Sequence, residues 1–424
     1  MHMLSLPKIV SLTSAYRRIT MKYDFTSLID RHGMDSSAVD HDPEGPSRKG
    51  IVLKEGITDH IPMEVADMNF ATVPTIPEAI IKRAQHPLFG YYRVRPEYFE
   101  EIIDWQSKRN GVTGLTADAI GYENSVLGGV ATALHVLCSA GDPILVSSPC
   151  YCGFLGVINN NGYKPVASPL RRDENGIWRM DFEDMDRRIK ENRIHVAIFC
   201  SPHNPSGRVW ERWEIEKAME VYKNNDVTVI SDEIWSDLIL RGNKHIPTQS
   251  VSEDAKYRTL AFYSTTKTFN LAGLIGAYHV IYNKTLRERM EKEASLGHYN
   301  GMNLMSMYAL IGAYKPEGYE WLDQLREVLS DNAEYAYKYI TEHFRGVTLA
   351  MPQGTYLLYI NCAEWLREHD MDLDALLKLG FEAGVDWQDG RSFLVPDTIR
   401  INTALPTERV KEAMRRLDKY VFNA

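Results

Sequence analysis

The feature that most constrains the fold is a pattern that occurs three times, in which a buried strand is followed by a polar residue at its carboxyl end. Asn204, Asp232 and Lys267 follow such apolar runs and are separated by about 28 and 35 residues. These lengths suit helix-bearing crossovers between parallel strands, which bring the three side chains to one edge of a sheet. The pattern predicts an α/β fold with a mainly parallel sheet. The runs cover residues 196–200, 227–231 and 259–263.

Lys267 follows hydroxyl residues at the end of the last run. In an open α/β sheet this edge faces the ligand crevice. An amine there could form an imine with a carbonyl cofactor while the hydroxyls hold a phosphate, which is what pyridoxal phosphate (PLP) requires. Taken alone, Ser-x-x-Lys is a common chance pattern, and a solvated lysine is the simpler interpretation. The recurrence of polar residues upstream favours a site.

Three further segments could contribute to a site. Small residues from Ser125 to Gly129 open an apolar helix, whose free N–H groups and dipole suit a phosphate, although a tight packing turn fits as well. Tyr151 follows a strand over 142–148 and could stack on a flat ring. The aromatic turn around Tyr91 fits either packing or a role in a site.

Composition excludes several classes of partner. The chain has 48 basic and 57 acidic residues, a formal net charge of -9, and no basic run that would neutralise nucleic-acid phosphates. No apolar run approaches the roughly 18 residues of a membrane helix, so we expect neither nucleic acid nor membrane as partner. The five cysteines are expected to be packing thiols in a reducing cytoplasm, and no metal site is expected.

At 424 residues, the chain is long enough for two or more domains. The stretch before residue 21 is expected to be an extension or an upstream start, and the polar stretch after it an N-terminal arm. We expect the chain end to form a small α+β domain. The expected divisions are 1–20 (extension), 21–70 (arm and part of the small domain), 71–317 (large PLP-binding domain) and 318–424 (C-terminal small domain).

Nearly everything after Met21 resembles the fold-type I PLP enzymes of the class I and II aminotransferase superfamily, and more closely their carbon–sulfur β-lyase branch. That branch includes cystathionine β-lyases and cysteine desulfhydrases related to the maltose-regulon modulator. The resemblance implies a large domain with a mainly parallel sheet and a small α+β domain built from both chain ends. It is carried in order by 24–25, 65–71, 89–91, 200–210, 231–234, 266–270, 353–356 and 400–402.

The resemblance also implies how PLP is held. Lys267 would bind its aldehyde and later remove the substrate Cα proton. Asp232 would keep the pyridine nitrogen protonated, and Asn204 would donate to the ring oxygen. Tyr151 would stack on the ring, and Trp235 stands where the lyase branch usually has histidine. The phosphate would be held by Ser125, Val126, Leu127, Ser264 and Thr266.

For the substrate, the resemblance implies that Arg400 clamps the α-carboxylate. Asp67 and Ala66 would lie near the substrate, and Asn204 would contact it. Tyr91 would reach the phosphate in the neighbouring subunit of a homodimer with shared sites.

The implied reaction is the β-elimination of cystathionine, cysteine or another S-substituted L-cysteine, with Tyr91 or Tyr151 protonating the leaving sulfur. An aminotransferase, and a lyase-like protein with an added regulatory binding role, stay open as alternatives. The segment 389–396 replaces a glycine-rich segment that the family usually has before its carboxylate-binding arginine.

Overall fold

The computed structural model describes residues 21–40, 50–297 and 300–423. Its central element is a seven-stranded sheet in the order β2-β10-β9-β8-β7-β3-β4. Neighbouring strands from β4 through β9 run parallel, and β10 is antiparallel to both of its neighbours. The predicted mainly parallel sheet is confirmed. The strands are β2 (Ile120–Glu123), β3 (Pro143–Ser148), β4 (Lys164–Pro169), β7 (Val196–Cys200), β8 (Thr228–Asp232), β9 (Thr259–Tyr263) and β10 (Ala277–Val280).

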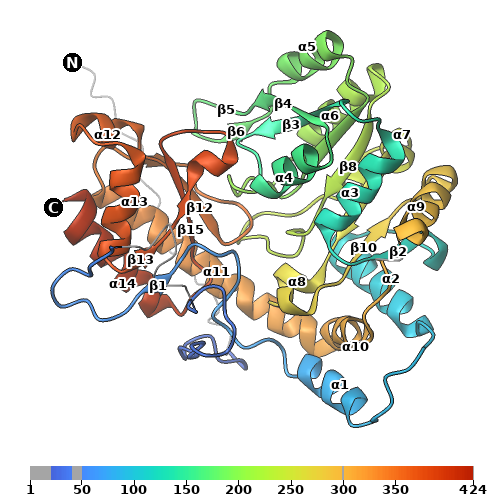
Figure 1. Cartoon of the computed structure of the whole chain (residues 1–424), viewed down its shortest axis with the longest axis horizontal. Coiled ribbons are helices and arrows are strands. Elements are labelled where there is room, and N and C mark those ends of the chain that lie inside the picture. Colours follow the sequence, from blue (N-terminus) through green and yellow to red (C-terminus); the bar gives the residue numbers. More distant parts are fainter. Residues whose placement is uncertain (1–20, 41–49, 298–299, 424) are drawn as a thin grey trace, which may run out of the picture.

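Helices cover both faces of this sheet because alternate strand residues point to opposite sides. Ile198 belongs to a buried cluster with residues of α3 and α4, whereas its neighbour Phe199 belongs to a cluster with residues of α5 and α6. Figure 1 shows α3 and α4 alongside the central strands. The helices around the sheet are α3 (Val126–Leu137), α4 (Cys152–Asn160), α5 (Phe182–Asn192), α6 (Arg212–Asn224), α7 (Glu253–Arg258) and α9 (Lys284–Gly297).

A second, antiparallel sheet of four strands occupies the C-terminal part, in the order β11-β12-β15-β14. The long helix α11 (Pro316–His343) contributes Trp321 to the core near the large sheet and Ile340 to the core of the C-terminal part (Figure 1). The other elements of this part are β11 (Thr348–Leu349), β12 (Leu357–Asn361), β14 (Gln388–Asp389), β15 (Thr398–Asn402), α12 (Ala363–Glu368), α13 (Leu373–Glu382) and α14 (Thr407–Leu417).

The N-terminal segment joins the C-terminal part, because β1 (Ile61–Pro62) pairs in parallel with β13 (Val385–Asp386). The sequence after Ile61 is typical of a short strand that ends in an acid, and the structure limits this strand to two residues. The rest turns away from a sheet because Asn402 satisfies its backbone: the Asn402 N–H donates to Met63 O at 2.8 Å. The Asn402 side chain donates to Val65 O at 2.8 Å. The exact domain boundaries stay a prediction.

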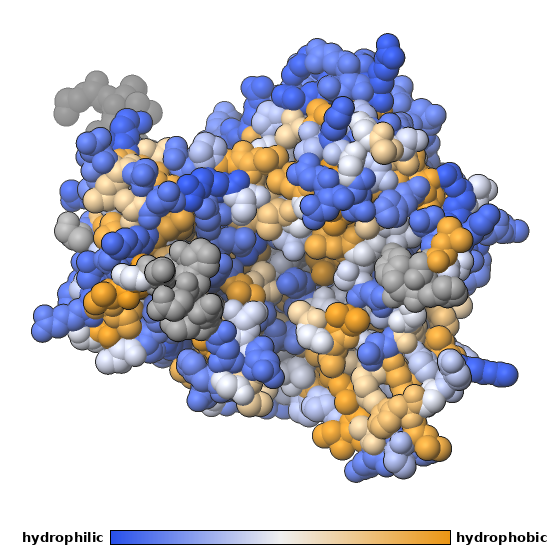
Figure 2. All heavy atoms as spheres, in the orientation of Figure 1, coloured by the Kyte–Doolittle hydropathy of each residue, from blue (hydrophilic) through white to orange (hydrophobic). Residues whose placement is uncertain are grey.

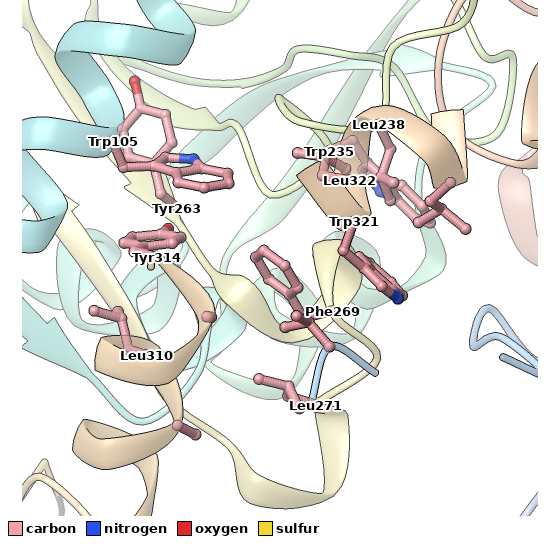
Figure 3. Close-up of a cluster of buried hydrophobic side chains, with 14 of the residues drawn as sticks. Trp105, Trp235, Leu238, Tyr263, Phe269, Leu271, Leu310, Tyr314, Trp321 and Leu322 are labelled. Atoms are coloured by element: carbon pink, nitrogen blue, oxygen red, sulfur yellow. The ribbon is translucent and has the colours of Figure 1, made fainter. Parts of the chain in front are cut away.

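An aromatic core surrounds Phe269, the residue that follows α8 (Figure 3). Trp105 stacks on Tyr314 with ring centres 4.3 Å apart, and Phe269 stacks on Trp321 at 5.4 Å. These rings fix the end of α8 because Phe269 is two residues beyond Lys267 and is fully buried. The surrounding helices are α1 (Thr75–Ala84), α2 (Pro96–Asn110), α8 (Thr265–Thr268) and α10 (Leu304–Ala313).

Large apolar side chains are exposed after α1. Leu88 and Phe89 are more than half exposed, and Tyr91 is fully exposed. Figure 2 shows apolar atoms gathered at the lower edge of the molecule, where Figure 1 places α1.

No helix in the described ranges has the length and apolar character needed to cross a membrane.

Candidate active site

A cavity of about 410 Å³ opens at the carboxyl edge of the central strands. Asn204, Asp232 and Lys267, which follow three neighbouring strands, all line this cavity, at the edge where open α/β sheets place their ligand crevices. The predicted site residues that line it are Ala66, Ser125, Val126, Leu127, Tyr151, Asn204, Asp232, Trp235, Ser264, Thr266, Lys267 and Arg400.

Lys267 projects into this cavity from α8, directly after β9. Its Nζ donates to Ala66 O at 2.7 Å and lies 5.7 Å from the centre of the Trp235 ring. Burial, together with the positive charge of Arg400, lowers the pKa of Lys267 to about 8. Most of the amine still carries its proton near pH 7, but the neutral fraction, which a nucleophile or a base requires, is far larger than for an unperturbed lysine.

A buried chain of hydrogen bonds holds the backbone around Lys267. The neighbouring Thr268 donates from Oγ1 to Asp237 Oδ2 at 2.9 Å, and Trp105 Nε1 donates to Asp237 Oδ1 at 3.0 Å. Since Asp237 is buried and both its oxygens accept, it fixes α8 against α2. The direction of the lysine therefore depends on the aromatic core of Figure 3.

Asp232 is the last residue of β8 and faces the same cavity. Its Oδ1 accepts the Ile234 N–H at 3.0 Å. Burial raises the pKa of Asp232 to about 7, and the adjacent Glu233 adds to the rise, although Lys267 opposes it. A buried carboxyl group of this kind gains most from a cationic neighbour, such as a protonated ring nitrogen.

The predicted phosphate residues lie together at two helix starts. Ser125 caps α3, and its Oγ accepts the Gly128 N–H at 2.9 Å. Ser264 Oγ lies 2.8 Å from Thr266 Oγ1 at the start of α8. These hydroxyl residues line one side of the cavity together with the start of α3, although Ser264 Oγ donates to Gly276 O at 2.8 Å in the protein as it stands. The free N–H groups of a helix start and nearby hydroxyls suit a phosphate.

Arg400 lies on β15, brought in from the C-terminal sheet. Its guanidinium donates to Asn204 Oδ1 at 3.2 Å and to Glu64 O at 3.1 Å. Arg400 is 3% exposed, and its Nε is a buried donor without an acceptor among the described residues. Burial lowers the pKa of Arg400 to about 10. A substrate carboxylate would supply the missing acceptor and the missing countercharge.

The segment 389–396 supports this arginine. Phe393 lies under the guanidinium, with 5.1 Å between Arg400 Cζ and the ring centre. The Phe393 carbonyl accepts the Cys150 N–H at 2.9 Å, which ties the segment to the residue before Tyr151. The unusual sequence therefore places an aromatic ring against the carboxylate clamp.

Two predicted residues lie apart from the cavity lining. Asp67 is half-buried and paired with Arg31, with Arg31 Nη2 2.6 Å from Asp67 Oδ2. Tyr91 is fully exposed in the described chain. Its role at a partner's site stays a prediction.

Sequence reasoning assigned no role to several residues of the site. Glu64, Asn124, Cys152 and Gln388 also line the cavity. Tyr356 donates from its hydroxyl to Ala66 O at 2.8 Å, the same oxygen that accepts from Lys267. The motif 353–356 marked Tyr356, but a backbone carbonyl as its partner leaves no trace in a sequence.

The comparison with protein families decides the assignment: the family described as aminotransferase class I and II matches residues 58–417. The chain belongs to the aminotransferase class I and II family. Within this family it is 29% identical to cystathionine beta-lyase PatB of Bacillus subtilis over 85% of this chain and 92% of the relative. It is 28% identical to protein MalY of Escherichia coli over 93% and 98%.

Solved structures of family members agree with the fold. The PLP-bound C-S lyase from Staphylococcus hominis superposes with a TM-score of 0.85 at 28% identity, covering 95% of this chain and 99% of that chain. A PLP-bound putative aminotransferase from Clostridium difficile gives 0.86 at 31% identity, covering 95% and 100%. The family depends on PLP.

The residues present fit PLP. The neutralisable amine of Lys267, the buried carboxyl of Asp232 and the donors at the start of α3 match an aldehyde, a ring nitrogen and a phosphate in turn. Bound PLP supplies an electron-accepting ring that stabilises negative charge developing at the substrate Cα. The arrangement can therefore support chemistry on an amino acid at its Cα–H and Cβ bonds.

Proposed function

We propose that the protein is a PLP-dependent carbon–sulfur β-lyase acting on cystathionine, cysteine or another S-substituted L-cysteine. The products would be pyruvate, ammonia and a thiol or sulfide. The observation that carries the proposal is the convergence of Lys267, Asp232 and Arg400 in one cavity. The names of relatives such as PatB and the Staphylococcus hominis C-S lyase favour sulfur amino acids as substrates.

Arg400 would orient the substrate. Its buried guanidinium would bind the α-carboxylate through the donor that now lacks an acceptor, and its contact with Asn204 would fix the angle of the fork. This clamp would hold the Cα–H bond at the side from which Lys267 enters. Orientation of this kind lowers the entropic part of the barrier.

Lys267 would move the proton. Its amine, with a pKa lowered to about 8, is available as a base near neutral pH and would take the proton from Cα. The Ala66 carbonyl, which accepts from Nζ at 2.7 Å, would hold the resulting ammonium close to the site. Asp232 would stabilise positive charge at the facing ring nitrogen.

A tyrosine would protonate the leaving sulfur. Burial raises the pKa of Tyr151 to about 12, so its hydroxyl carries a proton at neutral pH. The positive charge of Arg400 opposes this rise and would favour release of that proton to the leaving sulfur. Tyr91 is the second candidate donor, and it would come from a partner subunit because it is fully exposed in its own chain. We therefore also propose a homodimer in which the apolar segment around Leu88, Phe89 and Tyr91 is covered.

An aminotransferase is the second candidate, because a structural neighbour at 31% identity is described as a putative aminotransferase. Both reactions begin with removal of the Cα proton, so the same three residues serve either one. In an aminotransferase, Lys267 would return that proton to the cofactor. The bond between the substrate Cβ and its sulfur would stay intact.

The deciding experiment is incubation of the PLP-loaded enzyme with cystathionine in the absence of any keto acid. A lyase is expected to release pyruvate and a free thiol in equal amounts. If no thiol and no pyruvate form, but amino groups are transferred once a keto acid is added, the lyase is wrong and the aminotransferase takes its place. Lys267→Ala serves as the inactive control.

A further inference from the structure

A second cavity, of about 560 Å³, lies between a short hairpin and the C-terminal part of the chain. The hairpin consists of β5 (Arg171–Arg172) and β6 (Trp178–Arg179), and Figure 1 places it on the side of the large sheet near β12. The proposed reaction makes no use of this cavity. Its lining includes Arg172, Trp178 and Gln353.

Arg172 and Trp178 present their side chains to this cavity together because they are cross-strand partners in the hairpin. Arg172 Cζ lies 5.7 Å from the centre of the Trp178 ring. The neighbouring Arg171 lies on the opposite face, since side chains alternate along a strand, and its Nε lies 2.8 Å from Asp181 Oδ2. The hairpin thus separates a paired arginine from one directed at the cavity.

Arg172 has no carboxylate partner in the part of the chain that the structure describes. Its Nε donates to Gly176 O, and its Nη1 donates to Thr348 Oγ1, each at the long distance of 3.3 Å. Burial lowers the pKa of Arg172, as expected for a cation without a countercharge. Beside it, Trp178 Nε1 is a buried donor for which the described residues provide no acceptor.

The other arginines of this cavity are paired. Arg208 Nη2 lies 2.9 Å from Glu211 Oε1 and also contacts the buried Glu214. Arg241 lies 2.7 Å from both Glu327 and Asp331. The excess of positive charge and of unsatisfied donors is therefore concentrated at Arg172 and Trp178, where an oxyanion would satisfy both groups.

Two short segments link this cavity to the active site, although no single residue of the described chain lines both. Ser206 and Arg208 face it from the loop that carries Asn204, the hydrogen-bond partner of Arg400. Gln353 also lines it, and the Gln353 N–H donates to Gly207 O at 2.8 Å. Three residues later, Tyr356 contacts Ala66 O beside Lys267. Two short segments thus connect both sites.

We propose that this second cavity binds a small oxyanion, a carboxylate or a phosphate, between Arg172 and the indole N–H of Trp178, and that its occupancy modulates the active site through the Asn204 loop. The guanidinium fork matches two oxygens of such an anion, and the indole adds one further donor. The binding step is independent of the proposed lyase reaction.

The test is a titration of the PLP-loaded enzyme with inorganic phosphate, and separately with succinate, by calorimetry. Wild type is expected to bind at least one anion saturably in a component that Arg172→Gln weakens about 10-fold or more, because a charge-assisted contact is lost. Trp178→Phe, which keeps the ring and removes only the donor, is expected to weaken it several-fold. Arg171→Gln is the matched control and should bind like wild type.

The comparison of the two anions identifies the preferred chemistry. Only the component lost in Arg172→Gln is counted, because succinate can also reach Arg400 and phosphate the PLP phosphate site. If Arg172→Gln fails to fold, Arg172→Lys and Trp178→Phe carry the test. Absence of saturable binding of both anions to wild type, or unchanged binding in the Arg172 and Trp178 variants, would overturn the proposal.

The coupling has its own readout. Addition of the bound anion is expected to change the visible absorbance of enzyme-bound PLP or the KM for the amino acid in wild type and in Arg171→Gln. In Arg172→Gln, any change that remains reports anion binding at Arg400 or at the PLP phosphate site, and the part of the change that is lost reports the second cavity. Binding without any such change would refute the coupling and leave an anion site without influence on the active site.

Discussion

At the scale of the residue, burial sets the chemistry of the charged groups in the active site. Lys267 is shifted toward its neutral form, while Asp232 is shifted toward its protonated form by the same loss of water. Arg400 is buried as well, and its charge adds to the shift of Lys267. The three groups are therefore poised for ligands that supply the missing charges.

The lowered pKa of Lys267 predicts how the apoenzyme takes up PLP. Only the neutral amine can attack an aldehyde, so the rate of covalent attachment should rise with pH and level off above about 8. Stopped-flow absorbance of PLP binding across pH 6 to 10 checks this, with Lys267→Ala as the control that shows no covalent phase. A rate that still climbs steeply at pH 10 would contradict the shift.

The substitution Arg400→Lys tests how much the planar guanidinium of Arg400 contributes to substrate binding. Lysine keeps the charge but cannot make two parallel hydrogen bonds to a carboxylate. We expect KM to rise about 10-fold or more, with a smaller loss in kcat, because orientation of the carboxylate is weakened. Steady-state kinetics measures both constants, and an unchanged KM would place the carboxylate elsewhere.

At the scale of the element, the position of α3 depends on a close approach to the sheet. Gly129 lies one turn into α3, and a Cβ at this residue would come within 2.4 Å of the Phe262 ring on β9. The N–H groups that we expect to bind the PLP phosphate belong to the first turn of α3, just before Gly129. A helix pushed away from the sheet would therefore carry its donors away from the ligand.

Gly129→Ala is accordingly expected to lower the free energy of unfolding by about 1–3 kcal/mol through overpacking, and to weaken PLP binding. Gly156→Ala in α4 is the matched control, because no atom lies within 4 Å of the position that a Cβ would take there. The control should gain roughly 0.5–1 kcal/mol from helix propensity. Denaturant unfolding of the apo forms and PLP titration measure both effects, and equal behaviour of the two variants would contradict the packing argument.

Strands marked by a continuous apolar run were predictable from the sequence. Segments whose hydrogen-bond partners lie far away along the chain were not. The runs that became β7 and β9 are apolar throughout because helices bury both faces of the sheet, so they were found with their correct ends. The segment after Ile61 also looked like a strand, but its backbone is satisfied by Asn402, more than three hundred residues away. Local pattern carries no sign of such a partner.

At the scale of the whole molecule, the site is assembled from remote parts of the chain. Ala66, Lys267 and Tyr356 meet at a single carbonyl oxygen, and Arg400 enters from the C-terminal sheet. The sequence pointed to Ala66, Lys267 and Arg400 as site residues, but it assigned no role to Tyr356 and gave no sign of the contacts among the four. Their shared partner is a backbone group, and side-chain patterns cannot show which backbone group will be near.

The proposed homodimer predicts complementation between defective subunits. Tyr91→Ala and Lys267→Ala homodimers should each have little activity, since each lacks one component of every site. If Tyr91 acts across the interface, dissociation and reassociation of a mixture will form hybrids that have one site with both residues intact. Activity should reappear on mixing, and its absence from verified hybrids would show that Tyr91 does not act in a partner's site.

The place of β15 has a consequence for synthesis on the ribosome. This strand lies between β12 and β14, although it is among the last elements of the chain to be made. A nascent chain that stops before Thr398 already contains Lys267 but has no Arg400 to receive a carboxylate. Such a chain also lacks the positive charge that helps to lower the pKa of Lys267, so both carboxylate recognition and the full activation of the lysine await the synthesis of β15.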